Sequence, residues 1–330
     1  MKKVLSLALA VLMMFSFVAC SANKENTQTP AEKVNVNAYV LSGPTGIGAV
    51  NMMEDAKNGV GLENYNFNVV AAPDEIVAKI SNGEADIAAV ATNLAAKLYK
   101  VTDGGIKILA VNTLGVLNVL NYKGEAVSSL ADLKGRTIYT TGQGANPEYI
   151  IDYLLTQNGI NPDSDVTIEY KAEGTDLVPV WETDPNAVII APQPVATSIK
   201  IKYEGSTIAL DLTDEWKKVS PDSELMMGCI VVRNEFLNAN PKAVEAFLTD
   251  YEASVKKATD DVDTTATLCE QYGIVAKAPI AKAAIPNCNL CYITGNEMKT
   301  QLTGYLEVLL KADPKSIGGA VPGDDFWYEK

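Results

Sequence analysis

The chain has 330 residues, 47% of them hydrophobic, and its formal net charge is −14. That acidic balance argues against nucleic-acid binding, because neutralising phosphates takes clustered lysine and arginine. The sequence holds no histidine, which excludes Ser-His-Asp and Cys-His catalysis and histidine-based zinc sites, and we expect no metal and no cofactor.

The first twenty residues have the parts of an export signal. Two lysines precede an apolar run from Val4 to Val18, and Ala19 leads into Cys20. The run is short for a bilayer span, which needs about 20 apolar residues. The pattern predicts a lipoprotein signal peptide over 1–20, with Cys20 as the lipidated first mature residue. The alternative is an uncleaved anchor, and both interpretations place the rest of the chain outside the cytoplasm, attached to a membrane.

Residues 21–33 are small and polar, which is typical of a flexible tether. The rest of the chain is long enough for two lobes. The first cycle of strands is predicted over 34–41, 66–70, 85–91 and 106–112, with helices over 47–57, 74–82 and from 92 onward. The second cycle has strands over 136–140, 166–170 and 187–191, and a helix over 147–157. Such alternation predicts largely parallel sheets with helices on both faces.

The last part of the chain returns to apolar and helical patterns. A long apolar strand over 225–232 suits a crossing between the lobes, and helices are predicted over 241–257 and through most of 260–310. Four cysteines follow Cys20 in the sequence, and Cys288 and Cys291 have C-x-x-C spacing. Three interpretations stay open for this pair: a disulfide formed outside the cell, a pair of thiols, or no function.

Three loops that follow strands and precede helices carry glycine or short polar residues. They span 42–48, 92–93 and 140–147. A helix start exposes unpaired N–H groups, and glycine lets a ligand approach the backbone. The competing interpretation is helix capping, with Asn146 as the N-cap before Pro147. Three loops of the same chemistry favour a shared ligand site at the carboxyl ends of the strands.

Five segments carry a resemblance to a known family. They are SGPTGIG at 42–48, EIVAKISNGEADIA at 75–88, DLKGRTI at 132–138, APQP at 191–194 and VRNEFLNANP at 232–241. In order and spacing, the chain resembles the solute-binding lipoproteins of ABC importers. The group concerned includes sulfonate, nitrate or taurine, and thiamine-pyrimidine binding proteins, and the resemblance covers roughly 34–310.

The resemblance implies an α/β, type II periplasmic-binding-protein fold. Each of two lobes would have a mostly parallel sheet flanked by helices, and a two-segment hinge would join them. Lobe one would comprise 34–120 plus 233–330, and lobe two 121–232. The ligand residues carried over by motif are Ser42, Gly43, Thr45, Gly46, Thr92, Asn93, Gly142, Gln143, Gly144, Ala145, Asn146 and Gln193. Met226 and Met227 would line the hinge side.

The loops predict the chemistry of the solute. No arginine lies in any of the three, so an arginine–carboxylate clamp is not expected. We therefore expect a small polar or weakly anionic solute, with heteroaromatic ones included, held by backbone N–H, hydroxyl and amide groups. Four aromatic residues are candidates to stack on it, although a core or surface role is the competing interpretation for each. They are Tyr39, Tyr122, Tyr149 and Trp181.

The function implied by the resemblance is solute capture outside the cell for an ABC permease and its ATPase. The protein would be a monomer, attached to the outer face of the cell membrane, or on the periplasmic side, through its lipid. It would bind no nucleic acid and would not be an enzyme. Two alternatives stay open: a ligand-sensing lipoprotein without a transport role, and an enzyme on the same fold, such as a menaquinone-route dehydratase.

Overall fold

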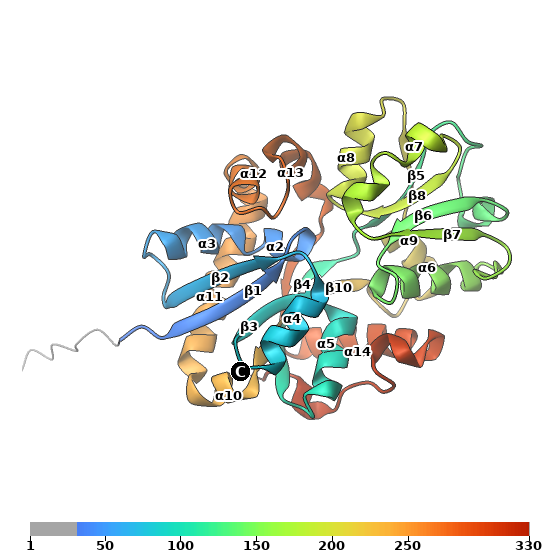
Figure 1. The fold of residues 1–330 in the computed structure, drawn as a ribbon. Helices are drawn as coiled ribbons and strands as arrows, with labels where there is room; N and C mark the ends of the chain where they lie inside the picture. The colour runs from blue at the N-terminus through green and yellow to red at the C-terminus, as the bar shows by residue number, and fades with distance from the viewer. Residues whose placement is uncertain (1–31, 330) are drawn as a thin grey trace, which may run out of the picture. The chain divides into compact units, whose positions relative to one another are not determined.

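Residues 32–329 are described by a computed structural model. The predicted signal peptide over 1–20, the predicted lipidation at Cys20 and most of the predicted tether lie outside the described residues. Val34–Lys330 forms one compact unit by its contacts, and two sheets lie within it (Figure 1).

The first sheet has six strands in the order β11-β4-β10-β3-β1-β2. Their bounds are β1 Asn35–Leu41, β2 Asn64–Val70, β3 Ile87–Ala91, β4 Ile106–Leu114, β10 Met226–Arg233 and β11 Leu290–Ile293. In β1, Val36, Ala38 and Val40 are buried while their neighbours are less so. This alternation is the pattern of a strand with one face against a core.

The second sheet has five strands in the order β7-β6-β8-β5-β9. Their bounds are β5 Leu117–Asn121, β6 Thr137–Thr141, β7 Thr167–Lys171, β8 Val188–Pro192 and β9 Thr207–Asp211. All five residues of β5 are buried, because this strand lies inside the sheet between β8 and β9. We call the first sheet with its helices lobe 1 and the second sheet with its helices lobe 2.

Both sheets are mixed, so the prediction of mostly parallel sheets is wrong. In lobe 1, β1 pairs in parallel with β2 and β3, whereas β10 is antiparallel to β3 and β4, and β11 is antiparallel to β4. In lobe 2, β6 is parallel to β7 and β8, and β5 is antiparallel to β8 and β9. The cause is the double passage between lobes: β4 leads out of the first sheet and β10 returns beside it in the opposite direction.

The two passages between the sheets lie at 115–116 and 220–225. Residues 117–120, which the predicted boundaries assign to lobe one, pair in the second sheet as part of β5. Residues 226–232, assigned to lobe two, pair in the first sheet as part of β10. The apolar run that we expected to cross between the lobes is therefore a sheet strand, and the crossing precedes it.

Helices cover both sheets. Lobe 1 has α2 Pro44–Ile47, α3 Val50–Lys57, α4 Pro73–Ser81, α5 Thr92–Val101, α10 Asn234–Ala239, α11 Pro241–Asp260, α12 Val262–Gln271, α13 Ala278–Ala284 and α14 Gly295–Ala312. It also has the short 3-10 helices η3 Ile285–Asn287, η4 Pro314–Ile317 and η5 Asp324–Phe326. Lobe 2 has α6 Asn146–Gln157, α7 Val180–Thr183, α8 Val195–Lys202, α9 Leu212–Val219, η1 Leu130–Leu133 and η2 Gly174–Leu177.

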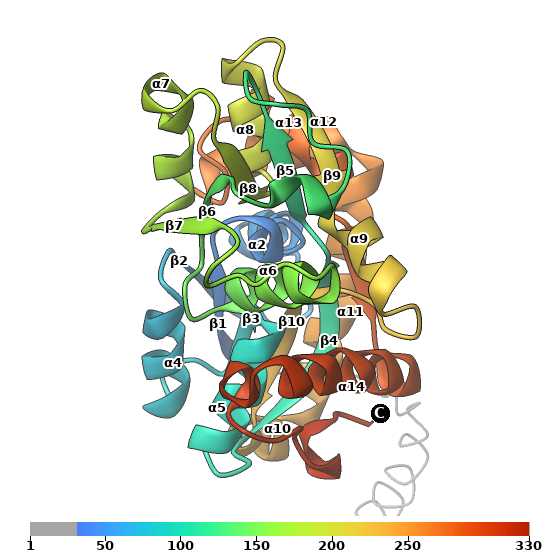
Figure 2. The ribbon, with the colours of Figure 1, turned by 90° about the vertical axis from the view of Figure 1, so that its right-hand side faces the viewer.

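The lobes meet along two helix pairs. The α6 helix of lobe 2 lies along α14 of lobe 1 (Figure 2), and α8 of lobe 2 contacts α13 of lobe 1. One apolar cluster continues from α6 and α9 into lobe 1, with Ile150, Leu154, Trp216 and Tyr305 among its members. Within residues 32–329, no helix is long and apolar enough to cross a membrane.

Candidate functional site

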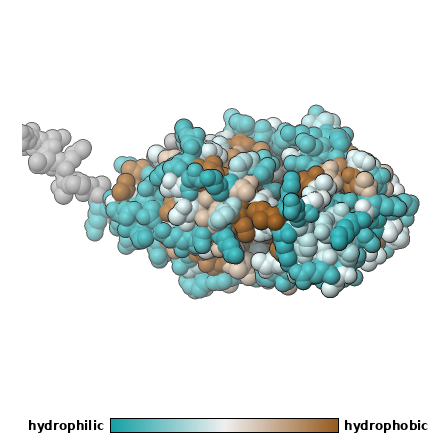
Figure 3. Space-filling model, turned by 90° about the horizontal axis from the view of Figure 1, so that it is seen from above, coloured by the Kyte–Doolittle hydropathy of each residue, from teal (hydrophilic) through white to brown (hydrophobic). Residues whose placement is uncertain are grey.

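A cleft of about 400 Å³ lies between the lobes on the side of α8 and α13. Segments 42–44, 71, 273–276 and Ile280 line it from lobe 1, and segments 141, 173–175, 192–195 and Ser198 line it from lobe 2. In the view of Figure 3, hydrophobic residues gather at the junction of the two lobes. The cleft collects loops that follow β1, β2, β6, β7 and β8, so both sheets present their strand ends to it.

Three of the twelve predicted ligand residues line this cleft: Ser42, Gly43 and Gln193. The N–H of Ser42 donates to Val70 O at 3.0 Å, and the N–H of Gly43 donates to Ile274 O at 2.9 Å. These two amides are already paired inside lobe 1. The amides of Ser42 and Gly43 are therefore not the free donors that the sequence predicted for the first loop.

Gly46 has a packing role beneath the same loop. It is buried, and a Cβ added there would overlap Leu41 O and lie 2.8 Å from Ile274 Cδ1. Because Ile274 lines the cleft, a larger residue at 46 would displace the cleft wall. Thr45 lies close by, and its carbonyl accepts a hydrogen bond from Asn112 Nδ2 at 3.1 Å.

Gln193 lies in the short connection between β8, which ends at Pro192, and α8, which begins at Val195, and it is fully buried. Its backbone N–H donates to Val116 O at 2.9 Å, and its Oε1 accepts from the Thr197 hydroxyl at 2.7 Å. Its Nε2 has no hydrogen-bond partner in the structure. A buried donor without a partner costs about 1–3 kcal/mol, and Gln193 is the cleft residue with such a buried side-chain atom among those that the structure describes.

Glu173 is the single charged residue among the described residues that line the cleft. Its side chain accepts from the backbone of Asp176, and its own N–H donates to Asp176 Oδ2 at 3.1 Å, which makes a capping box at the start of η2. The cleft thus contains one carboxylate, tied to a helix start, and the lining residues include no lysine or arginine.

Two other predicted ligand residues meet each other away from the cleft. Asn146 Nδ2 donates to Thr92 Oγ1 and to Met227 O, each at 3.3 Å, and Tyr305 Oη donates to Asn146 Oδ1 at 3.2 Å. Thr92 Oγ1 in turn donates to Met226 O at 2.6 Å. Asn146 belongs to lobe 2 and its partners to lobe 1, so these bonds join the lobes. We call the set Thr92, Asn146, Met227 and Tyr305 the latch.

The capping interpretation of Asn146 is wrong. Helix α6 begins at Asn146 itself, Ala145 is its N-cap, and no side chain caps it. The Asn146 side chain is 98% buried between the lobes, because lobe 1 offers it carbonyl and hydroxyl partners that the local chain does not. The backbone carbonyls of Met226 and Met227, the two residues expected on the hinge side, accept hydrogen bonds from Thr92 and Asn146.

The remaining predicted ligand residues, Asn93 and those of the turn before α6, do not line the cleft either. Asn93 Nδ2 donates to Ser316 O at 3.2 Å within lobe 1. Lys97 Nζ donates to Gly144 O at 3.2 Å across the lobes, and Gly144 N–H donates to Glu148. Gln143 is exposed, whereas Gly142 and Ala145 are half-buried. A Cβ on Gly142 would lie 2.7 Å from Pro147 Cγ, so this glycine lets the turn close on α6.

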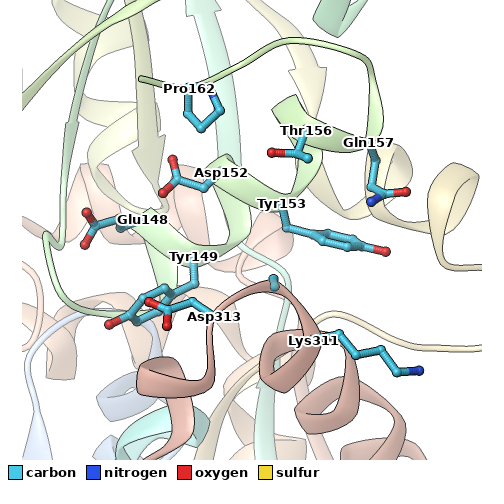
Figure 4. Close-up of a pocket in the computed structure, with 10 residues that line it drawn as sticks. Glu148, Tyr149, Asp152, Tyr153, Thr156, Gln157, Pro162, Lys311 and Asp313 are labelled. Atoms are coloured by element: carbon cyan, nitrogen blue, oxygen red, sulfur yellow. The ribbon is translucent and has the colours of Figure 1, made fainter. Parts of the chain in front are cut away.

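A second hollow, which we call the acidic groove, lies between α6 and the end of α14. It has a volume of about 690 Å³. Figure 4 shows Glu148, Tyr149 and Asp152 on the α6 side, with Lys311 and Asp313 across from them. Its walls are the faces of two helices instead of loops at strand ends.

The carboxylates of the acidic groove lie close enough to interact. Burial first, and then the charges of Glu148, Asp163 and Asp313, together raise the pKa of Asp152 to about 6. Burial lowers the pKa of Lys97, which lies 5.3 Å from the centre of the Tyr149 ring. The groove therefore carries repulsion between like charges, mostly within lobe 2 and to a smaller extent with Asp313 of lobe 1, beside the latch that joins the lobes.

The four aromatic candidates do not line the cleft. Trp181 stacks on Tyr122 with ring centres 5.2 Å apart, inside the core of lobe 2. Tyr39 packs against the core of lobe 1, and Tyr149 lines the acidic groove. The competing core or surface interpretation holds for these four residues in the structure.

Both arginines have structural partners. Arg136 donates to Asn186 O at 2.8 Å, and Arg233 forms a salt bridge with Asp86 at 3.1 Å. Neither lines the cleft, as the loops predicted.

Cys229, Cys269, Cys288 and Cys291 are free in the structure. Burial raises the pKa of the Cys288 and Cys291 thiols to about 12, so these thiols stay protonated and unreactive near neutral pH. Of the three interpretations of the C-x-x-C pair, the structure shows no disulfide. Among residues 32–329, no group of three or more acidic, cysteine or histidine residues could hold a metal ion.

Sequence reasoning missed two segments of the cleft wall. The loop 273–276 follows α12, and the loop 173–175 follows β7. Gly273-Ile274-Val275-Ala276 is small and apolar, and nothing in it distinguishes a cleft wall from a helix end. Glu173-Gly174-Thr175 has the acid, glycine and hydroxyl of a polar loop after a predicted strand, and that signal was available.

Comparisons with known proteins identify the family and the fold. A family model described as NMT1/THI5 like matches residues 59–264. The crystal structure of an ABC transporter from Parabacteroides distasonis is similar, with a TM-score of 0.74 and 22% identity over 89% of this chain and 99% of that chain. A search of the curated proteins finds no significant match.

Two further structures have ligands in their descriptions. The periplasmic aliphatic sulphonate binding protein SsuA from Escherichia coli has a TM-score of 0.70 and 11% identity, over 88% of this chain and 95% of its own. The periplasmic nitrate-binding protein NrtA from Synechocystis PCC 6803 has a TM-score of 0.61 and 13% identity, over 89% of this chain and 84% of its own. The similarities confirm the predicted two-lobed α/β periplasmic-binding-protein fold and the resemblance to this group of proteins.

Proposed function

This chain belongs to the NMT1/THI5 like family, and we propose that it is the substrate-binding protein of an ABC importer, which captures a small solute between its two lobes. The observation that carries the proposal is the cleft, because loops at the strand ends of both sheets line it. In open α/β sheets, ligands bind outside the carboxyl ends of strands.

The proposed binding mode is closure of the lobes on the solute. The hinge would be the two passages at 115–116 and 220–225, since these are the segments that link the sheets. Ser42, Gly43 and Gln193 would touch the solute, while Thr92 and Asn146 would hold the closed arrangement through the latch. A volume of about 400 Å³ lies within the range of small-molecule sites, which is roughly 300–1,000 Å³.

We propose the same cellular setting that the sequence predicted. The protein would be exported, attached by a lipid on Cys20 outside the cytoplasm, and act as a monomer that delivers solute to a permease and its ATPase. The similar structures support this, since their descriptions include an ABC transporter and two periplasmic binding proteins. An acidic chain with a net charge of −14 is consistent with a carrier that stays soluble near a membrane.

An enzyme on this fold is the weaker candidate. General acid–base chemistry needs a titratable group within hydrogen-bond reach of the reacting atom. Among the described residues that line the cleft, Glu173 is the one with an acidic or basic side chain, and its carboxylate caps η2. A protein that binds a solute without transforming it needs no such group in its binding cleft.

Mixing the purified full chain with a defined panel of small solutes tests the proposal. The panel contains alkanesulfonates, nitrate, pyrimidines, amino acids and simple amides, and native mass spectrometry detects what is retained. We expect one solute class to be bound with unchanged mass, and solution scattering to report a different radius of gyration with solute than without. Release of a product of altered mass would show that the protein is an enzyme and not a solute carrier. If no member of the panel is retained, the proposal is rejected.

A further inference from the structure

We propose that the solute is uncharged and presents a hydrogen-bond acceptor, a carbonyl oxygen or a ring nitrogen, to Nε2 of Gln193. This inference rests on the function proposed above and specifies its substrate class. It separates this cleft from sites for sulfonate or nitrate, which bind full anions.

The first step is the orientation of the Gln193 amide. The Thr197 hydroxyl donates to Oε1 at 2.7 Å, and Thr197 lies in the first turn of α8. This bond holds the oxygen toward the helix and leaves Nε2 as the free end. Since Nε2 is buried and has no partner, its two hydrogens favour an incoming acceptor.

The second step is the start of α8, which offers the same polarity. The first N–H groups of a helix have no intrahelical partner, and they carry partial positive charge. Val195 is the first residue of this helix, and Pro194 and Val195 line the cleft. The start of α8 thus adds backbone N–H donors to the Gln193 end of the cleft, and an acceptor on the solute would satisfy them.

The third step is the charge. A full anion in a partly dry cleft needs a cation or several converging donors to offset its lost hydration. The described residues that line this cleft include no lysine or arginine, and they include the carboxylate of Glu173. The net charge of −14 adds long-range repulsion of anions. A neutral solute can accept a hydrogen bond from Gln193 Nε2 without being repelled by the Glu173 carboxylate or by the net negative charge.

The fourth step is the rest of the wall, which is apolar. Ile274, Val275 and Ile280 from lobe 1 face Pro192 and Val195 from lobe 2 across the cleft. Such walls favour a solute with an apolar body and few polar atoms. Gln193 is fully buried, so the solute reaches it when the lobes part and is then enclosed with it.

Matched neutral and anionic probes test the proposal. Three pairs are used: nicotinamide and nicotinate, benzamide and benzoate, and propanesulfonamide and propanesulfonate. Thermal shift and calorimetry on the purified full chain at pH 7 give the affinities. We expect the neutral member to bind more tightly in at least one pair, and Gln193→Met to weaken that binding about tenfold, as loss of one buried hydrogen bond predicts.

Three further variants locate the effect. Gln157→Met makes the same change in the acidic groove and should leave affinity unchanged. Thr197→Val should weaken binding of the neutral probe because Gln193 loses its orientation, and Thr197→Ser should restore it because the hydroxyl returns. These positioning variants keep the proposal testable if Gln193→Met does not fold.

The outcomes separate this inference from the proposed function. Tighter binding of nicotinate, benzoate or propanesulfonate than of the neutral partner would overturn the uncharged class while leaving solute capture intact. Neutral binding that Gln193→Met does not alter would overturn the role of Nε2. No binding of any probe would count against both.

Discussion

Two edges of the contact between the lobes use similar residues in opposite ways. At the latch, both donors and the acceptor of the Asn146 amide are paired with lobe 1. At the cleft, Gln193 has a paired oxygen and an unpaired nitrogen. Both residues are almost fully buried. Asn146 begins α6, and Gln193 lies two residues before α8, so each stands near the start of a helix that contacts the other lobe. A satisfied amide stabilises the arrangement of the lobes, and an unsatisfied one leaves an interaction for a solute to complete.

The largest effect is expected from Asn146→Ala. The change removes three hydrogen bonds between the lobes and leaves Tyr305 Oη and Met227 O without these partners, which costs about 2–3 kcal/mol. The lobes should part, and solution scattering should give a larger radius of gyration. Asn158→Ala at the other end of α6 is the matched control, because its amide bonds Leu154 O within lobe 2. An unchanged radius of gyration in Asn146→Ala would remove the distinction between the two edges.

Gly46→Ala should alter the wall of the cleft and leave the hydrogen bonds of the latch in place. Its added methyl would overlap Leu41 O and press on Ile274, which should lower the free energy of unfolding by about 2 kcal/mol. Chemical denaturation measures this loss, and binding of the neutral probes should weaken with it. Gly144→Ala is the contrasting variant, because no atom lies within 4 Å of its added Cβ and its φ is +75°. Gly144→Ala measures the cost of backbone strain alone, whereas Gly46→Ala adds a close contact, and an unchanged free energy of unfolding in Gly46→Ala would contradict tight packing at this position.

Asp152→Asn should give a smaller, pH-dependent gain. The pKa of Asp152 is raised to about 6 in the folded protein, above the ordinary range near 3.9. Folding therefore favours the protonated form, and the ionised carboxyl destabilises the protein as the pH rises through 6. Above that pH, Asp152→Asn should stabilise by about 1 kcal/mol, after allowance for solvent screening. At pH 4 the gain should vanish.

Asp165→Asn provides the control of opposite sign. Hydrogen bonds from Asn161 and Lys134 lower the pKa of Asp165, so its ionised form stabilises the folded protein above pH 4 and this variant should lose stability there. Denaturation midpoints at pH 4 and pH 7.5 measure both effects. Stabilisation of Asp152→Asn that does not change with pH would contradict repulsion in the acidic groove.

The smallest effect is expected from Lys97→Met. It removes the bond from Nζ to Gly144 O and the contact with the Tyr149 ring, which together contribute about 0.5 kcal/mol at this partly exposed position. A double-mutant cycle with Asn146→Ala should show coupling, because both residues join the same two elements across the lobes. Simple additivity would mean that Lys97 acts independently of the latch.

Local patterns in the sequence were enough to predict most strands and helices of the fold. The alternation in β1 and the helical spacing in α4 and α11 correspond to observed elements. The sequence did not predict β5, β9 or β11, which are short and have no distinctive period. The antiparallel direction of β10 was not predicted from the sequence either, because its pairing with β3 and β4 depends on where the chain returns from lobe 2.

The candidate site was predicted only in part. Ser42, Gly43 and Gln193 were singled out and line the cleft, while the wall at 273–276 was missed. Thr92 and Asn146 were singled out for the same chemistry and are paired with each other. A short polar side chain before a helix has the same local signature whether its partner is a solute or another lobe.

The sequence by itself determined the acidic, histidine-free composition, the alternation of strands and helices, and the polar loops at strand ends. These depend on residue type and on spacing within a few positions. The tertiary structure alone decided which loops share the cleft, since Gln193 and Ile274 are distant in the chain and line the same cleft. It also decided which buried amide is satisfied, because a hydrogen-bond partner supplied by another lobe has no trace in the neighbouring sequence.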